Sequence, residues 1–139
     1  LDKNKDLFEV TGYEWPTRDG TGIRDYLHVW DLSLAHVKAI ENFDNIFDDK
    51  FSFMAINVGT GIGTTVMEFV RAFEEVSGVE IPQKKSQPRP GDNAGVFASN
   101  EKAKILLDWT PRMSLEQGIA DGIKWANKKF PTNQVNIGP

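Results

Sequence analysis

Apolar residues recur at helical spacing in three stretches of the chain, and each stretch predicts an amphipathic helix. Asp31 is a suitable N-cap for the first helix, and Thr64 or Thr65 for the second. Ser114 and Gln117 have the spacing of a capping box at the start of the third helix. The apolar stripes that we expect to face the core are Leu34, Val37, Ile40 and Phe43 in the first helix, Val66, Phe69, Val70, Phe73 and Val76 in the second, and Leu115, Ile119, Ile123 and Ala126 in the third.

Shorter apolar runs between these helices predict strands. The expected strands are 7–11, 25–29, 53–56 and 79–81. The run at 53–56 is apolar throughout, which is typical of a buried parallel strand. A short helix is expected at 101–107. Polar residues, glycine or proline predict loops at 15–22, 44–51 and 82–90. Strands that alternate with helices predict an α/β fold.

Composition narrows the classes of function. A chain of 139 residues is long enough for one domain. The net charge of −4 argues against a general nucleic-acid binder, which usually carries a basic face. The absence of cysteine excludes disulfides and cysteine-bound zinc, and the spacing of His28 and His36 does not indicate a metal site. No apolar run reaches the roughly 20 residues of a membrane span. We therefore expect a cytoplasmic protein without a membrane or nucleic-acid partner.

The stretch 56–65, INVGTGIGTT, contains a glycine-rich turn between a predicted strand and a predicted helix. This layout cradles phosphate in dinucleotide-binding proteins, whose fingerprint has glycine at its first, third and sixth positions. Here those positions are Gly59, Gly61 and Thr64, and Glu80 falls near the place of the acidic residue that binds the ribose. Threonine is bulkier than the glycine that it replaces. Two interpretations stay open, a cofactor loop and a structural turn.

Two arginines lie at or in predicted loops of this acidic chain. A guanidinium at Arg24 can hold a phosphate or a carboxylate through two hydrogen bonds; the alternative is a surface ion pair with Asp25. Arg89 stands between two prolines, with the carboxylate of Asp92 three residues further on. This pair suits a ligand that carries both phosphate and hydroxyl groups, although an ion pair that closes a turn is the alternative. Together the two arginines favour an anion site.

No catalytic residue is expected within this chain. Tyr13 and Tyr26 are followed four places on by Thr17 and Trp30, so neither forms a Tyr-x-x-x-Lys pair. No paired nucleophile and base stands out either. The sequence therefore predicts binding rather than catalysis.

Three segments of the chain carry a family resemblance. They are YEWPTRDGTGIRDYLHVWDLSLAHVKAIE, INVGTGIGTTVMEFVRAFEEVSG and RPGDNAGVFASNEKAKILLDWTP, in this order. Together they resemble the UDP-glucose 4-epimerases of the extended short-chain dehydrogenase/reductase superfamily, from about Val10 to Trp125. The resemblance implies that residues 1–139 are the C-terminal substrate-binding portion, and that the N-terminal NAD-binding domain is absent. It also places the glycine turn downstream of the family's dinucleotide loop, so no cofactor-binding residue is expected here.

The resemblance implies a role for several residues in binding a UDP-sugar. Arg24 and Arg89 are expected to contact the diphosphate, and Asp92 the ribose of the uridine. The strand around Glu9 to Thr11 is expected to meet the uracil, mostly through its backbone.

Three positions bear on how far the family pattern applies. Thr11 stands where the family often has an aromatic residue, and Trp15 replaces a usual tyrosine. Val96 aligns with a gate position beside the sugar, where large residues are associated with refusing N-acetylated sugars. Valine is smaller, so we hypothesise that the complete enzyme also accepts UDP-N-acetylhexosamines.

The family's mechanism is transient oxidation at C4 of the sugar by tightly bound NAD, rotation of the keto-sugar, and return of hydride to its other face. The catalytic tyrosine, lysine and Ser/Thr belong to the N-terminal part. We therefore expect the full-length protein to be a homodimeric isomerase of galactose metabolism, and this chain alone to be inactive. The alternatives are another nucleotide-sugar epimerase, decarboxylase or dehydratase of the superfamily, and a non-catalytic nucleotide-sugar binding module.

Overall fold

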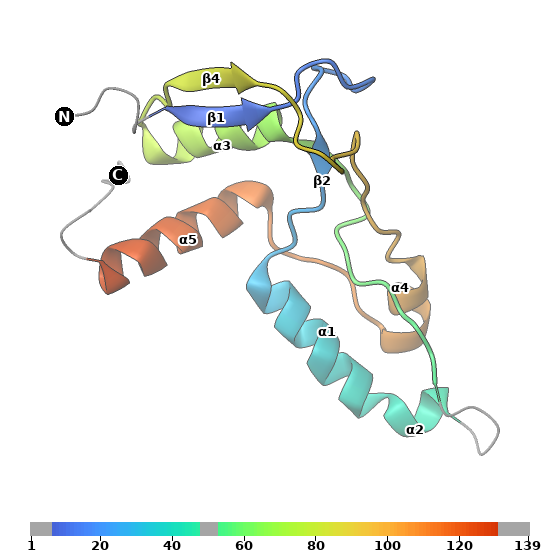
Figure 1. Cartoon of the computed structure of the whole chain (residues 1–139). Helices are drawn as coiled ribbons and strands as arrows, with labels where there is room; N and C mark the ends of the chain where they lie inside the picture. Colours follow the sequence, from blue (N-terminus) through green and yellow to red (C-terminus); the bar gives the residue numbers. More distant parts are fainter. Residues whose placement is uncertain (1–6, 48–52, 131–139) are drawn as a thin grey trace.

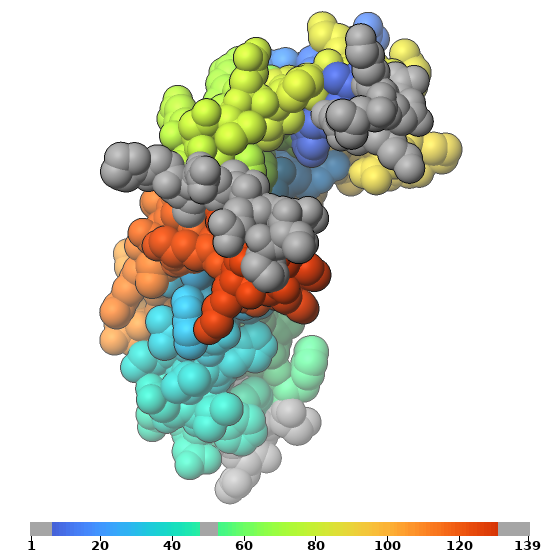
Figure 2. Space-filling model, turned by 90° about the vertical axis from the view of Figure 1, so that its left-hand side faces the viewer, coloured from blue at the N-terminus to red at the C-terminus, as the bar shows by residue number. Residues whose placement is uncertain are grey.

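The computed structural model describes residues 7–47 and 53–130 (Figure 1). Strands and helices are mixed along the chain, which confirms the predicted α/β class. The elements are β1 (Phe8–Thr11), β2 (Ile23–Arg24), α1 (Val29–Glu41), α2 (Phe43–Ile46), β3 (Thr64–Thr65), α3 (Val66–Ser77), β4 (Gln83–Ser86), α4 (Glu101–Leu107) and α5 (Leu115–Lys129). The molecule is elongated, with β1, β4 and α3 at one end, α1, α2 and α4 at the other, and α5 between them (Figure 1, Figure 2).

Two small strand pairs shape the end of the molecule that carries α3. β1 and β4 run parallel, in a register that pairs Phe8 with Gln83 and Thr11 with Ser86. β2 and β3 form a short antiparallel pair, in which Arg24 lies opposite Thr64. Because β3 leads directly into α3, this second pair holds the start of that helix beside β2.

The caps of the helices are largely as the sequence predicts. Thr65 caps α3 through a capping box with Glu68, and Gly78 ends that helix in the left-handed conformation. The hydroxyl of Ser114 accepts from the N–H of Gln117 at the start of α5. The predicted cap of α1 is wrong. The helix begins earlier, at Val29, because the His28 ring accepts from the N–H of Trp30 and so caps it.

Two predicted strands, at 25–29 and 79–81, are wrong. Residues 25–28 are irregular and Val29 already belongs to α1, while the short strand β2 lies just before them. Residues 79–81 are also irregular. The strand that pairs with β1 is 83–86, within a stretch predicted to be a loop. Its residues are polar, and three of the four are exposed. This strand therefore forms because it pairs with a distant segment, and its sequence contains no apolar pattern from which a strand could be predicted.

The third predicted strand, 53–56, is also wrong. Within the described residues it has no paired neighbour, and a strand needs such a neighbour to satisfy its backbone. The predicted loop at 44–51 lies partly outside the described residues, and its first part is the end of α2. The first predicted strand, at 7–11, is confirmed by β1.

Among the residues that the structure describes, the hydrophobic core forms two clusters. One joins α1 and α4 through Ala35, Ala103, Leu107 and Trp109. The other joins α3 and α5 through Ala72, Ile119 and Ile123. The stripes predicted for α3 and α5 supply much of the second cluster, as expected. The stripe predicted for α1 does not face a core, because α1 packs through its alanines instead. Its exposed fractions are 42% for Leu34, 48% for Val37 and 77% for Ile40.

Within the described part of the chain, no helix combines the length and the apolar character needed to cross a membrane.

Candidate functional site

The glycine-rich turn holds a carboxylate of the chain itself. Asp25 Oδ1 accepts from the backbone N–H of Thr60 at 3.0 Å and from its hydroxyl at 2.6 Å. Asp25 Oδ2 accepts from the N–H of Ala98 at 3.0 Å. We call this set of contacts the Asp25 clamp. Partial burial by itself raises the pKa of Asp25, but the hydrogen bonds from Thr60 and Ala98 outweigh it and hold the pKa below its ordinary value.

Close packing explains two of the glycines in this turn. A Cβ on Gly59 would overlap Asp25 Oδ2 and the side chain of Ala98. A Cβ on Gly63 would lie 2.6 Å from carbons of both Ile23 and Phe97. Both positions therefore exclude a side chain for reasons internal to the fold. The geometry favours the structural interpretation of the turn over the cofactor loop.

A second clamp fixes the loop that precedes β2. Asp19 Oδ1 accepts from the N–H and the hydroxyl of Thr21, at 2.9 and 2.7 Å, and Oδ2 accepts from the hydroxyl of Thr65 at 2.5 Å. Burial raises the pKa of Asp19, but these hydrogen bonds outweigh it and lower the pKa overall. Arg18 adds an ion pair with Glu68 in the first turn of α3. The loop that precedes β2 is thus tied to the start of α3.

The residues expected at a diphosphate lie near one another. Arg24 leaves β2, and its guanidinium donates to the carbonyl of Ile23 at 2.7 Å. The N–H of Ile23 donates to the carbonyl of Ala94 at 2.8 Å, and Ile23 also forms a bridge with Gly95. These bonds hold the loop that contains Asp92 against β2. The predicted alternative for Arg24, an ion pair with Asp25, is wrong because the clamp occupies that carboxylate.

Asp92 pairs with Arg89 and also lies within the electrostatic reach of Arg24. Its Oδ2 accepts from the backbone N–H of Arg89 at 3.0 Å and from the guanidinium Nε at 3.4 Å. The N–H of Arg89 is the largest cause that lowers the pKa of Asp92, and the charge of Arg24 lowers it further. The ion pair that was the alternative for this loop is therefore present. The Arg89 side chain is nevertheless 70% exposed, so it remains open to a ligand. We call Arg24, Arg89 and Asp92 the arginine cluster.

The outer edge of β1 offers backbone groups. The N–H of Phe8 donates to the carbonyl of Pro82, just before β4, at 2.8 Å. The N–H of Gly12 donates to the carbonyl of Ser86, in β4, at 2.9 Å. Since a strand's backbone groups alternate in direction, those of Glu9 and Thr11 point to the other edge. In the described residues no third strand covers that edge. The Glu9 side chain is turned to β4, where the Ser86 hydroxyl, and then Lys84, lower its pKa.

Val96 projects from the same loop as Asp92. It is 73% exposed and lies between Gly95, which is held against Ile23, and the tethered Ala98. The structure therefore fixes the backbone on both sides of Val96 and leaves its side chain open.

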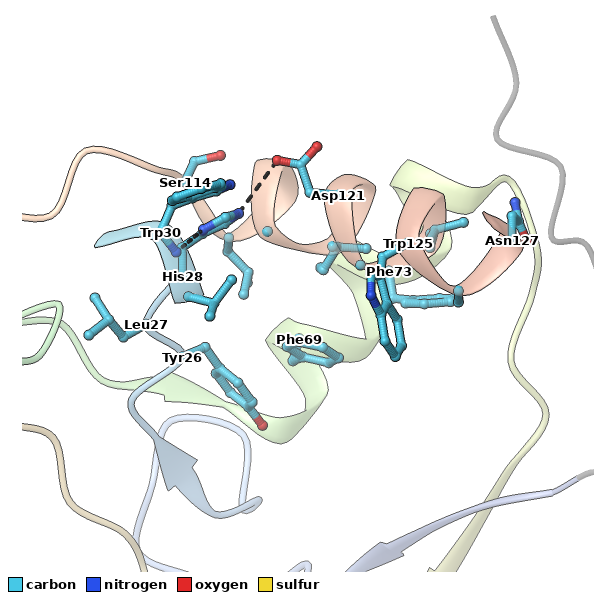
Figure 3. A pocket seen from close by; sticks show the side chains of 17 residues that line it. Tyr26, Leu27, His28, Trp30, Phe69, Phe73, Ser114, Asp121, Trp125 and Asn127 are labelled. Carbon is cyan, nitrogen blue, oxygen red and sulfur yellow. Dashed lines mark hydrogen bonds and ion pairs between the residues drawn. The ribbon is translucent and has the colours of Figure 1, made fainter. Parts of the chain in front are cut away.

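A separate apolar groove lies between α3, α5 and the segment that enters α1 (Figure 3). Its volume is about 980 Å³. Tyr26 stacks on Phe69 with ring centroids 4.5 Å apart, and Trp125 lies further along α5. His28 lies nearly buried at one end, with Nε2 3.5 Å from Asp121. None of the arginine cluster lines this groove. Sequence reasoning missed it, because its aromatic residues are spread over three distant segments.

Among the residues that the structure describes, no group of three or more His, Cys, Asp or Glu is arranged to hold a metal ion.

Comparison with known proteins defines the family and the fold class of this chain. The family model described as GDP-mannose 4,6 dehydratase matches residues 2–122, and the chain belongs to this family. The chain resembles the C-terminal part of UDP-glucose 4-epimerases, which are extended short-chain dehydrogenases/reductases. "UDP-glucose 4-epimerase 3" of Oryza sativa subsp. japonica is 49% identical over 119 residues, which are 86% of this chain and 31% of that protein. The chain thus spans about a third of this relative's length.

Solved structures give the same result. The UDP-glucose 4-epimerase of Stenotrophomonas maltophila, with bound NAD and formylated UDP-arabinopyranose, has a TM-score of 0.83 and 36% identity over 91% of this chain and 37% of its own. The enzyme of Bifidobacterium longum, in complex with NAD+ and UDP, has a TM-score of 0.79 and 36% identity over 90% of this chain and 36% of its own.

Proposed function

We propose that this chain is the UDP-binding portion of a UDP-glucose/UDP-galactose 4-epimerase of galactose metabolism. The observation that supports this most is the arginine cluster, because two cations and one carboxylate meet in a loop region held by bonds to β2. Arg24 and Arg89 bind the diphosphate, and Asp92 accepts from a hydroxyl of the ribose. The two guanidinium groups bring positive charge to the negatively charged diphosphate.

The uracil is read by the outer edge of β1. Uracil carries one N–H donor between two carbonyl acceptors, and the backbone of Glu9 and Thr11 offers both donors and acceptors at that edge. This recognition does not need the aromatic residue that the family often has in place of Thr11. It does require the edge of β1 to remain open in the complete protein.

NAD binds outside this chain in the proposed enzyme. The glycine turn does not fit a dinucleotide, because the donors of Thr60 already hold Asp25 and Gly59 leaves no room beside it. The N-terminal part of the enzyme supplies the nicotinamide chemistry together with the catalytic Tyr-x-x-x-Lys. The chain alone therefore binds UDP but does not turn over UDP-sugars. The complete protein is a homodimer in the cytoplasm.

The apolar stripe of α1 is consistent with this proposal. Leu34, Val37 and Ile40 are exposed, and adjoining apolar side chains of this size usually mark a contact surface. In the complete enzyme they pack against the part of the protein that this chain does not contain.

The test is titration of the purified chain with UDP and with NAD in a calorimeter. UDP binds, and NAD does not. Arg24→Ala and Arg89→Ala each weaken UDP binding by about ten- to a hundredfold, as expected for the loss of a charge-assisted hydrogen bond. Arg112→Ala is the matched control: it removes the same charge at an exposed position outside the arginine cluster and leaves the affinity unchanged. A chain that is folded and does not bind UDP at millimolar concentration contradicts the proposal.

The second candidate is another nucleotide-sugar enzyme of the same family, and the description of the matching family model favours it. An enzyme that acts on a GDP-sugar, as the description of that family model reads, would bind a different base at the β1 edge. Competition between UDP and GDP for the chain separates the two: the epimerase requires preference for UDP, and a preference for GDP supports the alternative. A non-catalytic binding module would show the same UDP affinity. It is distinguished by the complete coding sequence, which in that case lacks an upstream Tyr-x-x-x-Lys.

A further inference from the structure

Asp25 stands where three segments of the chain meet: the end of β2, the glycine turn and the loop that contains Asp92. It follows Arg24 directly in the chain, and its carboxylate reaches Thr60 in the glycine turn and Ala98 at the end of the loop that carries Asp92 and Val96. Three donors for one carboxylate satisfy both of its oxygens. Removing the side chain would leave the two backbone N–H groups without their acceptor.

The contacts of Asp25 fix a loop at its far end. The near end of that loop is already held, since Ile23 binds Ala94 and bridges Gly95. The Asp25 clamp adds a second attachment three residues beyond Gly95, at Ala98. Both attachments come from residues that flank Arg24. The position of Arg24 relative to the loop that carries Asp92 therefore depends on residues on each side of it.

We propose that Asp25 is a positioning residue for the diphosphate site, which sets the position of Arg24 relative to the Arg89–Asp92 loop without touching the ligand. This inference rests on the proposed function, because the ligand is the diphosphate named there. Its consequence is selective: loss of the clamp weakens binding of the diphosphate more than binding of the nucleoside.

Asp25→Asn is the sharpest variant. The amide has nearly the shape of the carboxylate but replaces one acceptor oxygen by an N–H₂ donor, which must face either Ala98 or Thr60, both of which donate. Asp19→Asn is the matched control. Asp19 also receives three hydrogen bonds from backbone and hydroxyl groups, but it ties the preceding loop to α3 and has no contact with the Asp92 loop.

The experiment compares UDP with uridine as calorimetric probes of the whole chain. A variant that merely unfolds more molecules lowers both affinities by the same factor, so the ratio of the two dissociation constants is insensitive to stability. Asp25→Asn is expected to reduce the preference for UDP over uridine by about tenfold, and Asp19→Asn to leave it unchanged. An unchanged ratio in Asp25→Asn, or an equal loss in Asp19→Asn, overturns the positioning role.

A second measurement separates this inference from the proposed function. Amide hydrogen exchange, followed by NMR without any ligand, reports the loop directly. Asp25→Asn speeds exchange at Ala98 and also at Arg89, whose N–H is bound by Asp92, whereas Asp19→Asn speeds neither. If the chain binds no UDP, the proposed function fails and these rates still decide whether Asp25 orders the loop. Unchanged exchange at Arg89 refutes that ordering.

Discussion

The buried carboxylate of Asp31 provides the most demanding test of how this fold is held together. Asp31 has no exposed surface, and its Oδ2 accepts from the N–H groups of Arg112 and Met113 at 3.0 and 2.9 Å. Its backbone carbonyl accepts from the Trp109 indole at 3.0 Å. The first turn of α1 is thus bound to the segment between α4 and α5. Within the described residues, Oδ1 has no hydrogen-bond partner.

The two variants Asp31→Ala and Asp31→Asn differ in what they leave behind. Alanine removes the carboxylate that accepts both hydrogen bonds and leaves the two N–H groups without an acceptor. The free energy of unfolding is therefore expected to fall by about 3 kcal/mol. Asparagine keeps an acceptor for both N–H groups and replaces only Oδ1, which has no partner to lose among the described residues. Its cost is expected to be about 1 kcal/mol, because the amide N–H₂ is buried without an acceptor.

Urea unfolding followed by tryptophan fluorescence measures both values, since the buried Trp109 donates to the backbone carbonyl of Asp31. Asp44→Ala is the control at an exposed carboxylate, with an expected change within about 0.5 kcal/mol. If Asp31→Ala costs no more than this control, the two hydrogen bonds contribute nothing to stability and the reasoning is refuted. If Asp31→Asn costs as much as alanine, the charge itself is what the fold requires.

Three further predictions concern the clamps and the loop. Folding lowers the pKa of Asp25, so the charged carboxylate stabilises the fold at pH values above its ordinary pKa of 3.8, and this stabilisation is lost as the pH falls below that value. Asp25→Asn should therefore weaken the loss of stability at acid pH. An unchanged dependence of stability on acid pH contradicts this prediction. Gly63→Ala should cost about 1–3 kcal/mol in a urea titration, because its Cβ meets Ile23 and Phe97, whereas Gly122→Ala, with open space around it, should be neutral or stabilising. The full-length protein should turn over UDP-GalNAc because Val96 is small and open; activity with UDP-galactose alone refutes this, and Val96→Tyr should abolish the N-acetylated activity selectively.

Elements that depend on neighbouring residues could be predicted from this sequence, whereas elements that depend on contacts between distant segments could not. The caps at Thr65 and Ser114 involve residues within one helical turn, so their pattern is complete in the sequence. By contrast, β4 exists because it pairs with β1, which lies more than seventy residues earlier. The alternating run at 25–29 has the right pattern for a strand, but the fold provides no neighbour for it and His28 starts a helix instead.

The same distinction applies to the site. The contact between Arg89 and Asp92 could be predicted because the two residues lie three positions apart in one loop. Arg24 was a candidate from its own place where a loop enters a predicted strand, and the family resemblance then gave both arginines the same expected ligand. The Asp25 clamp was not predictable, because its donors are 35 and 73 residues away. The acidic side chain next to Arg24 instead looked like a partner for that arginine. Only the fold shows that the Asp25 carboxylate is held by Thr60 and Ala98 rather than paired with Arg24.

The glycine turn explains why sequence alone could not decide between a cofactor loop and a structural turn. A turn that binds an anion needs small residues for close approach, a free backbone N–H and a hydroxyl donor, and these requirements are the same for a phosphate and for a carboxylate. Gly59 and Thr60 meet all of them, and the anion that they bind is Asp25. The resemblance to a nucleotide loop therefore has a physical cause. In the enzyme that we propose, the turn affects the diphosphate indirectly, by holding Asp25.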